Sequence, residues 1–128
     1  MPWTVYTDEE LWKANVKLAK FRKWAKANPD VLRWMHRRIR WHVETGSRTS
    51  AKRLFEQARY DSGIRIVDVE GEVKLKNDFT PLVARILVKS IPEAKSLLVT
   101  KKSVFDLLDD SQVPHFDTWG TLVWDDAA

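Results

Sequence analysis

The sequence contains no cysteine. A disulfide, a thiolate nucleophile and a zinc site built on cysteine are therefore excluded, and a reducing cytoplasm is consistent with this composition. No apolar run approaches the length that crosses a membrane, and the N-terminus lacks the basic-then-apolar layout of a signal peptide. From these absences we expect a soluble, cytoplasmic protein that makes no membrane contact.

Histidine is scarce, and the three residues are His36, His42 and His115. His36 and His42 are six positions apart, which puts them on different faces of a helix, and no carboxylate stands at metal-ligand spacing. We therefore expect no metal site. The turn Gly46–Ser50 lacks the Gly-Lys-Ser/Thr ending of a phosphate-binding loop, and no Gly-x-Ser-x-Gly elbow is present. The sequence predicts a protein that is not an enzyme and has no cofactor.

Basic residues are absent after Lys102. All 22 Lys and Arg lie at or before that position, where 12 acids leave a net charge of +10, whereas six aspartates after it stand without a base. This asymmetry suits a polyanion-binding body with an acidic tail, and a solvated charged surface with no ligand is the alternative. At 128 residues the chain fits one domain. We expect a basic body at residues 1–108 and an acidic, aromatic, partly ordered tail at residues 109–128.

The stretch from Met35 to Tyr60 predicts two helices joined by a tight turn. The first helix ends at Gly46, the residue type best suited to the left-handed conformation just past a helix end. A turn this short makes the helices pack at a steep angle, as in a helix-turn-helix unit. Apolar residues of the second helix recur at i, i+3, i+4 and i+7 and form one stripe, at Ala51, Leu54, Phe55 and Ala58.

Capping signals predict further helices on both sides of this pair. Thr7 and Glu10 form a capping box that opens a helix running to Asn28–Pro29, where a second helix begins with a cap and a proline. Thr80–Pro81 begins another helix in the same way, and Ile91–Pro92 ends it. The apolar faces expected to point inward are Leu11, Ala14, Leu18, Phe21 and Ala25; Leu32, Met35, Ile39 and His42 or Val43; and Leu82, Val83, Ile86 and Leu87.

Alternating residues after the helix pair predict a short β-hairpin. Ile64–Ile66 and Val73–Lys76 alternate apolar and polar residues, and Gly71 supplies the turn. A hairpin directly after a helix-turn-helix unit is the arrangement of a winged helix. We therefore expect a mainly α, winged-helix-like single domain with a short β-hairpin and an acidic C-terminal tail. Within the tail, Thr121–Trp124 either forms an edge strand or orders only on contact with a partner.

Residues 45 to about 93 also carry a recurring pattern. It consists of Gly46, Ser50-Ala51-Lys52, Leu54-Phe55-Glu56, Arg59-Tyr60, Val73-Lys74-Leu75-Lys76-Asn77, Pro81, Ala84-Arg85 and Pro92-Glu93. In this pattern the chain resembles a group of small bacteriophage and prophage proteins, most of them uncharacterised. It departs from the group in a longer hairpin and in its tryptophan-rich front and acidic end. The resemblance implies a phage-encoded protein in the cytoplasm of a bacterial host, and it assigns no catalytic or ligand residue.

The first functional hypothesis is a regulatory or accessory protein that binds double-stranded DNA without covalent chemistry. The helix from Ser50 would enter the major groove, and the basic cluster before Trp41 would contact the backbone. The residues expected to contact DNA are Arg37, Arg38, Arg40, Arg48, Ser50, Lys52, Arg53 and Gln57, with Lys74, Lys76 and Asn77 from the hairpin.

The alternative hypothesis is a phage protein that binds and modulates a host protein. Seven tryptophans cannot all be buried in so small a core without unpaired indole N–H groups, so some are expected at the surface. The contact would use Phe116, Trp119 and Trp124 of the acidic tail. A hybrid is also open, in which the tail folds over the basic helices and competes with DNA.

Overall fold

The computed structural model describes residues 7–60, 63, 79–100 and 102–125. Four α-helices form most of this part of the chain: α1 (Asp8–Ala27), α2 (Pro29–Thr45), α3 (Ala51–Tyr60) and α5 (Thr80–Ser90). The strands are β1 (Thr49–Ser50), β2 (Leu98–Val99), β3 (His115–Phe116) and β4 (Leu122–Val123), and the 3₁₀ turns are η1 (Pro92–Ser96), η2 (Val104–Leu107) and η3 (Asp110–Gln112). The mainly helical class is confirmed. The hairpin predicted at residues 64–76 lies outside the described residues.

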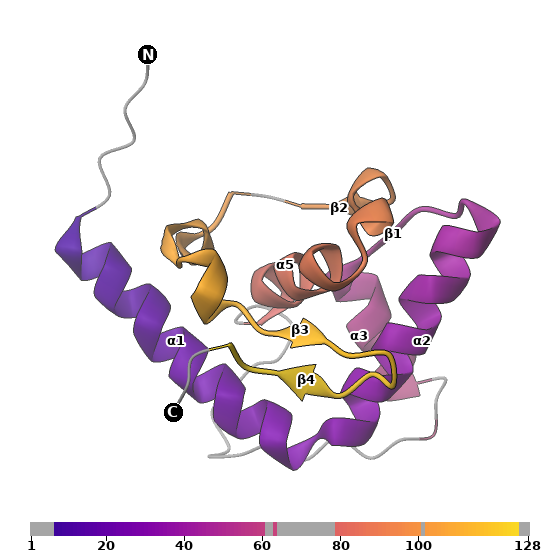
Figure 1. Cartoon of the computed structure of the whole chain (residues 1–128), viewed down its shortest axis with the longest axis horizontal. Helices are drawn as coiled ribbons and strands as arrows, with labels where there is room; N and C mark the ends of the chain where they lie inside the picture. The colour runs from indigo at the N-terminus through magenta and orange to yellow at the C-terminus, as the bar shows by residue number, and fades with distance from the viewer. Residues whose placement is uncertain (1–6, 61–62, 64–78, 101, 126–128) are drawn as a thin grey trace.

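The strands form two separate pairs. β1 and β2 are parallel, with Thr49 opposite Leu98, and β3 and β4 are antiparallel, with His115 opposite Val123. Figure 1 shows the β3–β4 hairpin lying between α1 and α2, in front of α3 and α5. The first pair therefore fixes the start of α3, and the second covers the corner where α1 meets α2.

The helix starts follow the local sequence with two differences. The Thr7 hydroxyl accepts a hydrogen bond from the Glu10 N–H at 3.2 Å, which confirms the predicted cap of α1. Asn28 makes no side-chain cap for α2; its amide instead donates to the Trp24 carbonyl at 2.9 Å, because that carbonyl is left open at the end of α1. Thr80 is the first residue of α5 and Phe79 precedes it as the cap residue.

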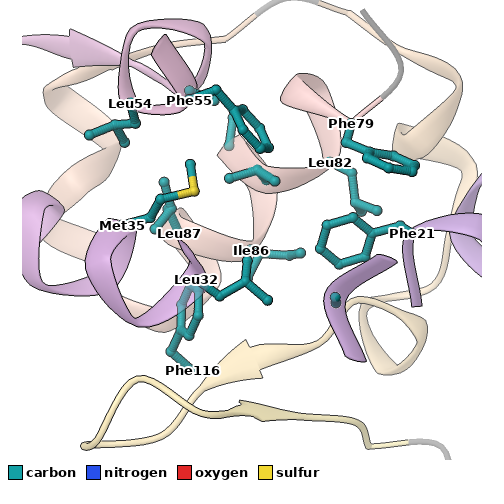
Figure 2. Close-up of a cluster of buried hydrophobic side chains, with 14 of the residues drawn as sticks. Phe21, Leu32, Met35, Leu54, Phe55, Phe79, Leu82, Ile86, Leu87 and Phe116 are labelled. Atoms are coloured by element: carbon teal, nitrogen blue, oxygen red, sulfur yellow. The ribbon is translucent and has the colours of Figure 1, made fainter. Parts of the chain in front are cut away.

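The core is built from one face of each helix. Figure 2 shows side chains of all four helices, together with Phe79 and Phe116, pointing into one cluster. The predicted stripes of α2, α3 and α5 are buried, apart from the half-buried alternative Val43. In α1 the prediction differs at both ends: Leu11 is 42% exposed, whereas Trp24, outside the predicted stripe, is fully buried. Trp24 contacts Phe55 with a ring-centroid distance of 5.8 Å.

The C-terminal segment continues into this packing across the boundary predicted at residue 109. Val113 and Phe116 are buried, and the Phe116 N–H donates to the Ser90 hydroxyl on α5 at 2.7 Å. The predicted strand at Thr121–Trp124 is present in part as β4. Residues 109–125 therefore pack on the helices, and Val113 and Phe116 form part of the core.

Tryptophans occupy both the core and the surface. Trp24 is fully buried with no described partner for its Nε1, whereas Trp12, Trp41 and Trp119 are exposed. The expectation that some tryptophans reach the surface is confirmed. None of the described helices is long and apolar enough to cross a bilayer.

Candidate nucleic-acid interface

The turn between α2 and α3 is fixed at both ends. Gly46 ends α2 at φ +70°, in the left-handed region, and its N–H and that of Ser47 point back to the His42 carbonyl. The Ser50 hydroxyl then accepts the Arg53 N–H at 3.1 Å and caps α3. The predicted helix pair and its Gly46 terminator are confirmed, although a specific helix-turn-helix fold is not established by them.

His42 lies where the two helices meet. Its side chain is buried, and Nδ1 lies 3.1 Å from the Ser47 carbonyl oxygen. Burial lowers the pKa of His42; the Ser47 hydrogen bond acts in the opposite direction, and the charges of Arg38 and Arg53 lower the pKa further. One imidazole therefore experiences positive charge from α2 and α3 together.

Arg38 is held beside an aromatic ring. The Arg38 guanidinium carbon lies 4.1 Å from the ring centroid of Trp41, and Trp41 is 42% exposed. Such stacking fixes the plane of the guanidinium, while its terminal N–H groups stay available for an anion. We call Arg38, Trp41, His42, Arg53 and Gln57 the α2–α3 seam.

Three polar atoms of the α2–α3 seam are buried without a hydrogen-bond partner among the described residues: Arg38 Nε, His42 Nε2 and Gln57 Oε1. Arg38 and His42 are one helical turn apart on α2, and Arg53 and Gln57 are one turn apart on α3, so each pair shares a face. Buried polar atoms are normally satisfied, and an unpaired buried polar atom marks a place that a ligand or ordered water can complete.

Arg37 and Arg40 lie on a different flank of α2. Both are exposed, and both act on the buried His36: burial and the charge of Arg40 lower the pKa of His36, the Asp117 carboxylate raises it, and Arg37 lowers it. Each residue advances a helix by about 100°, so neighbours in sequence point in different directions. The arginines predicted to act as one cluster are thus divided between the α2–α3 seam and the C-terminal hairpin.

The remaining predicted DNA contacts are dispersed. Arg48 is exposed in the turn, and Lys52 lines a cavity of about 410 Å³ with Ser50, Pro81 and Arg85. Lys74, Lys76 and Asn77 lie outside the described residues. Of the predicted set, the structure therefore brings together Arg38 and Arg53, which both act on His42, and Gln57 follows Arg53 by one turn of α3.

Aspartates after Lys102 pair with α5. Arg85 Nε lies 2.6 Å from Asp106 Oδ1, and Lys89 Nζ lies 2.9 Å from Asp125 Oδ2 and 3.5 Å from Asp110 Oδ2. None of the ion pairs within the described residues involves Arg38 or Arg53. Among the described residues, these aspartates therefore pair with α5 and not with the α2–α3 side, and the prediction that the tail competes with DNA stays a prediction.

The three aromatic residues predicted to contact a protein have different environments. Trp119 is 81% exposed, but Trp124 is half-buried against Phe21 and Phe116 is a core residue, 5% exposed. The prediction that Phe116 lies on a contact surface is wrong, because its ring packs at 5.1 Å against the imidazole of His36.

His42 was missed as a member of the candidate site. Its position in the apolar stripe of α2 predicts a core residue, and the structure confirms that burial. The available signal was its spacing four residues after Arg38, which places the imidazole on the same face as a guanidinium.

Comparisons with protein-family models, with curated proteins and with solved structures find no match to this chain. Function is therefore inferred from the surface of α2 and α3.

Proposed function

We propose that this protein binds double-stranded DNA non-covalently through the α2–α3 seam. The observation that carries the proposal is the convergence of Arg38 and Arg53 on His42, with no described carboxylate paired to either guanidinium. Guanidinium forks match phosphate oxygens, and clustered positive charge is the main source of affinity for a polyanion.

Each residue of the seam has a distinct role in this proposal. Arg38, steadied by Trp41, contacts one phosphate, and Arg53 in the first turn of α3 contacts another. Gln57 follows Arg53 by one turn, and its amide nitrogen is a donor for a base edge or a phosphate beside the Arg53 contact. α3 is then the element that lies in the groove, as in helix-turn-helix proteins. The resemblance to small phage proteins leads us to place it among phage-encoded regulatory or accessory proteins.

The test is fluorescence anisotropy with a labelled short duplex over a range of salt concentrations. We expect the logarithm of the association constant to fall linearly with the logarithm of salt, by about 0.9 per phosphate contacted. Arg38→Gln and Arg53→Gln should each weaken binding about tenfold and reduce that slope by about one contact.

Arg59→Gln is the matched control, because Arg59 is also an exposed arginine of α3 but lies on another face. It should leave the affinity within about twofold of the unmodified protein. Absence of saturable binding at low salt, binding independent of salt, or an equal loss in Arg59→Gln would each contradict the proposal.

One observation favours the alternative of host-protein binding. Trp119 is 81% exposed at the turn of the β3–β4 hairpin, and exposed tryptophans are enriched at protein contacts. Trp119→Ala should abolish capture of a bacterial partner by the tagged protein if this alternative is right. Capture that is unchanged in Trp119→Ala excludes this alternative, whereas duplex binding does not depend on the substitution.

A further inference from the structure

A second site lies away from the α2–α3 seam, where α1 meets α2 beneath the C-terminal hairpin. It is a cavity of about 360 Å³, within the size range of small-molecule pockets. Gly120 forms part of its wall at φ +83°, and a Cβ there would lie 3.3 Å from the Arg33 Cα atom. Only glycine therefore lets the hairpin turn approach α2 this closely and close the cavity.

The rim of this cavity is cationic. Arg22 and Lys26 of α1 and Arg33 of α2 line it, and no carboxylate does among the described residues. Arg33 uses Nη2 in a 2.6 Å bond to Asp30, an exposed carboxylate outside the cavity lining, and its fork carries further donors. A cationic rim of this kind favours a ligand that carries an anionic group.

Part of the cavity lining is apolar and includes one aromatic ring. Leu32, Leu122 and Trp124 are among its lining residues, and the Arg22 guanidinium carbon lies 4.5 Å from the ring centroid of Trp124. Phe21 packs against the same indole at 6.3 Å, so the ring is fixed from the core side. Because the guanidinium already lies over the indole, a flat, aromatic group would stack on the guanidinium plane.

We propose that this cavity binds one unpaired nucleotide, that is, a nucleoside monophosphate unit. Lys26 and Arg33 hold the phosphate, and the base lies against the wall of Trp124 and Arg22. Both features are those by which proteins hold single nucleotides: cations along the backbone and an aromatic platform for the base. A paired base in a duplex is stacked on both faces and cannot enter, so the site is distinct from the duplex-binding α2–α3 seam.

Isothermal titration calorimetry of the full chain with a nucleoside monophosphate is the first test. We expect saturable binding with one ligand per chain. The nucleoside without phosphate and ribose 5-phosphate without base should each bind at least about tenfold more weakly, because each lacks one of the two contacts. Equal binding of ribose 5-phosphate and the nucleotide would overturn the role of the planar wall.

Matched variants test the location. Lys26→Gln removes a rim cation and should weaken nucleotide binding about tenfold, whereas Lys20→Gln removes an exposed lysine of the same helix that does not line the cavity. Thr121→Phe places a ring at an exposed lining position and should block binding while the circular dichroism spectrum is retained. No binding of any mononucleotide, or equal losses in Lys20→Gln and Lys26→Gln, would overturn the proposal.

Two further binding measurements identify the source of the nucleotide and distinguish this site from the duplex-binding α2–α3 seam. A single-stranded oligonucleotide should bind more tightly than the mononucleotide if the natural ligand is a strand end, and no more tightly if it is a free nucleotide. Arg53→Gln should weaken duplex binding without changing mononucleotide binding. Failure of duplex binding would therefore contradict the proposed function but not this site. Failure of mononucleotide binding would contradict this site but not duplex binding by the α2–α3 seam.

Discussion

Lys89 joins α5 to the C-terminal segment through several bonds from one ammonium group. Its Nζ donates to the carbonyls of Asp110 at 2.5 Å and Val113 at 2.6 Å, and to the Asp125 carboxylate at 2.9 Å. The bond from Lys89 is the main reason that the pKa of Asp125 lies below its ordinary value. A single half-buried lysine thus holds three points of a segment that has little regular structure.

Lys89→Met should lower the free energy of unfolding by about 2 kcal/mol, because it leaves partly buried carbonyls without a donor. Urea denaturation followed by circular dichroism measures this change. Lys95→Met is the control, since Lys95 is exposed on η1 and makes no bond to residues 109–125, the described part of that segment. Equal stability of the two variants would show that the Lys89 bonds contribute nothing.

Asp106 makes the stability of the fold depend on pH. Burial raises the pKa of this carboxyl, but the hydrogen bonds from Arg85 and from the Ser103 N–H outweigh burial, and the net pKa is lowered from 3.8. A carboxyl with a lowered folded-state pKa stabilises the fold above its unfolded-state pKa, and this contribution is lost as the pH falls through the folded-state value.

Asp106→Asn should therefore destabilise the protein at pH 7 and change its stability much less at a pH well below 3.8. Urea midpoints at the two pH values measure the difference. Asp109→Asn is the control, because Asp109 is exposed and has no described ion pair. A constant gap between Asp106→Asn and the unmodified protein at both pH values would contradict this assignment.

At the scale of elements, the junction between α2 and α3 depends on one left-handed residue. Gly46 has φ +70°, and a Cβ added there would meet no atom within 4 Å. Any cost of substitution is therefore a backbone cost and not a packing cost.

Gly46→Ala should destabilise the fold by about 1 kcal/mol, the cost of holding an alanine in the left-handed region. Gly46→Asn should cost less, because asparagine tolerates this conformation better. Thermal or urea unfolding ranks the three proteins. An alanine variant as stable as the asparagine variant would mean that the turn relaxes to another conformation.

The elements themselves were largely predictable from sequence, because their signals are local. The Thr7 cap, the Gly46 terminator and the apolar stripe of α3 each depend on residues within a few positions of one another. The exposure of Leu11 was not predictable in this way, since it depends on where the end of α1 projects beyond the core. Nor was the role of Asn28, whose amide had two open helix ends within reach.

At the scale of the whole molecule, some basic side chains have acidic partners and others do not. The acidic C-terminal segment is matched to Arg85 and Lys89 of α5, and Arg38 and Arg53 at the α2–α3 seam have no ion pair within the described chain. The sequence predicts both signs of charge but not this partition. It depends on which helix lies beneath the C-terminal segment, and that is a property of tertiary packing.

Because Phe116 is buried in the core, we expect the C-terminal segment to unfold together with the helices. Phe116→Ala should lower the free energy of unfolding by about 3 kcal/mol, because it leaves a cavity between β3, α2 and α5. Trp119→Ala, which removes an exposed ring from the same hairpin, should change stability by less than about 0.5 kcal/mol. Calorimetry should show one transition for each variant; a second transition in unmodified protein would indicate that residues 109–125 unfold separately.

The candidate site was predictable only in part for the same reason. Arg38, Arg53 and Gln57 were identified from charge and residue type, but the approach of Arg38 and Arg53 to His42 requires the packing of α2 on α3. The cavity under the hairpin had no sequence signal, since its walls come from three segments that meet only in the folded chain.

The parallel β1–β2 pair limits how the helix pair can be studied. Thr49 lies two residues before α3, and its N–H donates a 2.9 Å hydrogen bond to the carbonyl of Leu97, which is far away in the sequence. A synthetic peptide spanning α2 and α3 would lack this clasp, and helices of this length are marginal in water on their own. Grafting the two helices onto another scaffold would therefore transfer their residues without the spacing between Arg38 and Arg53.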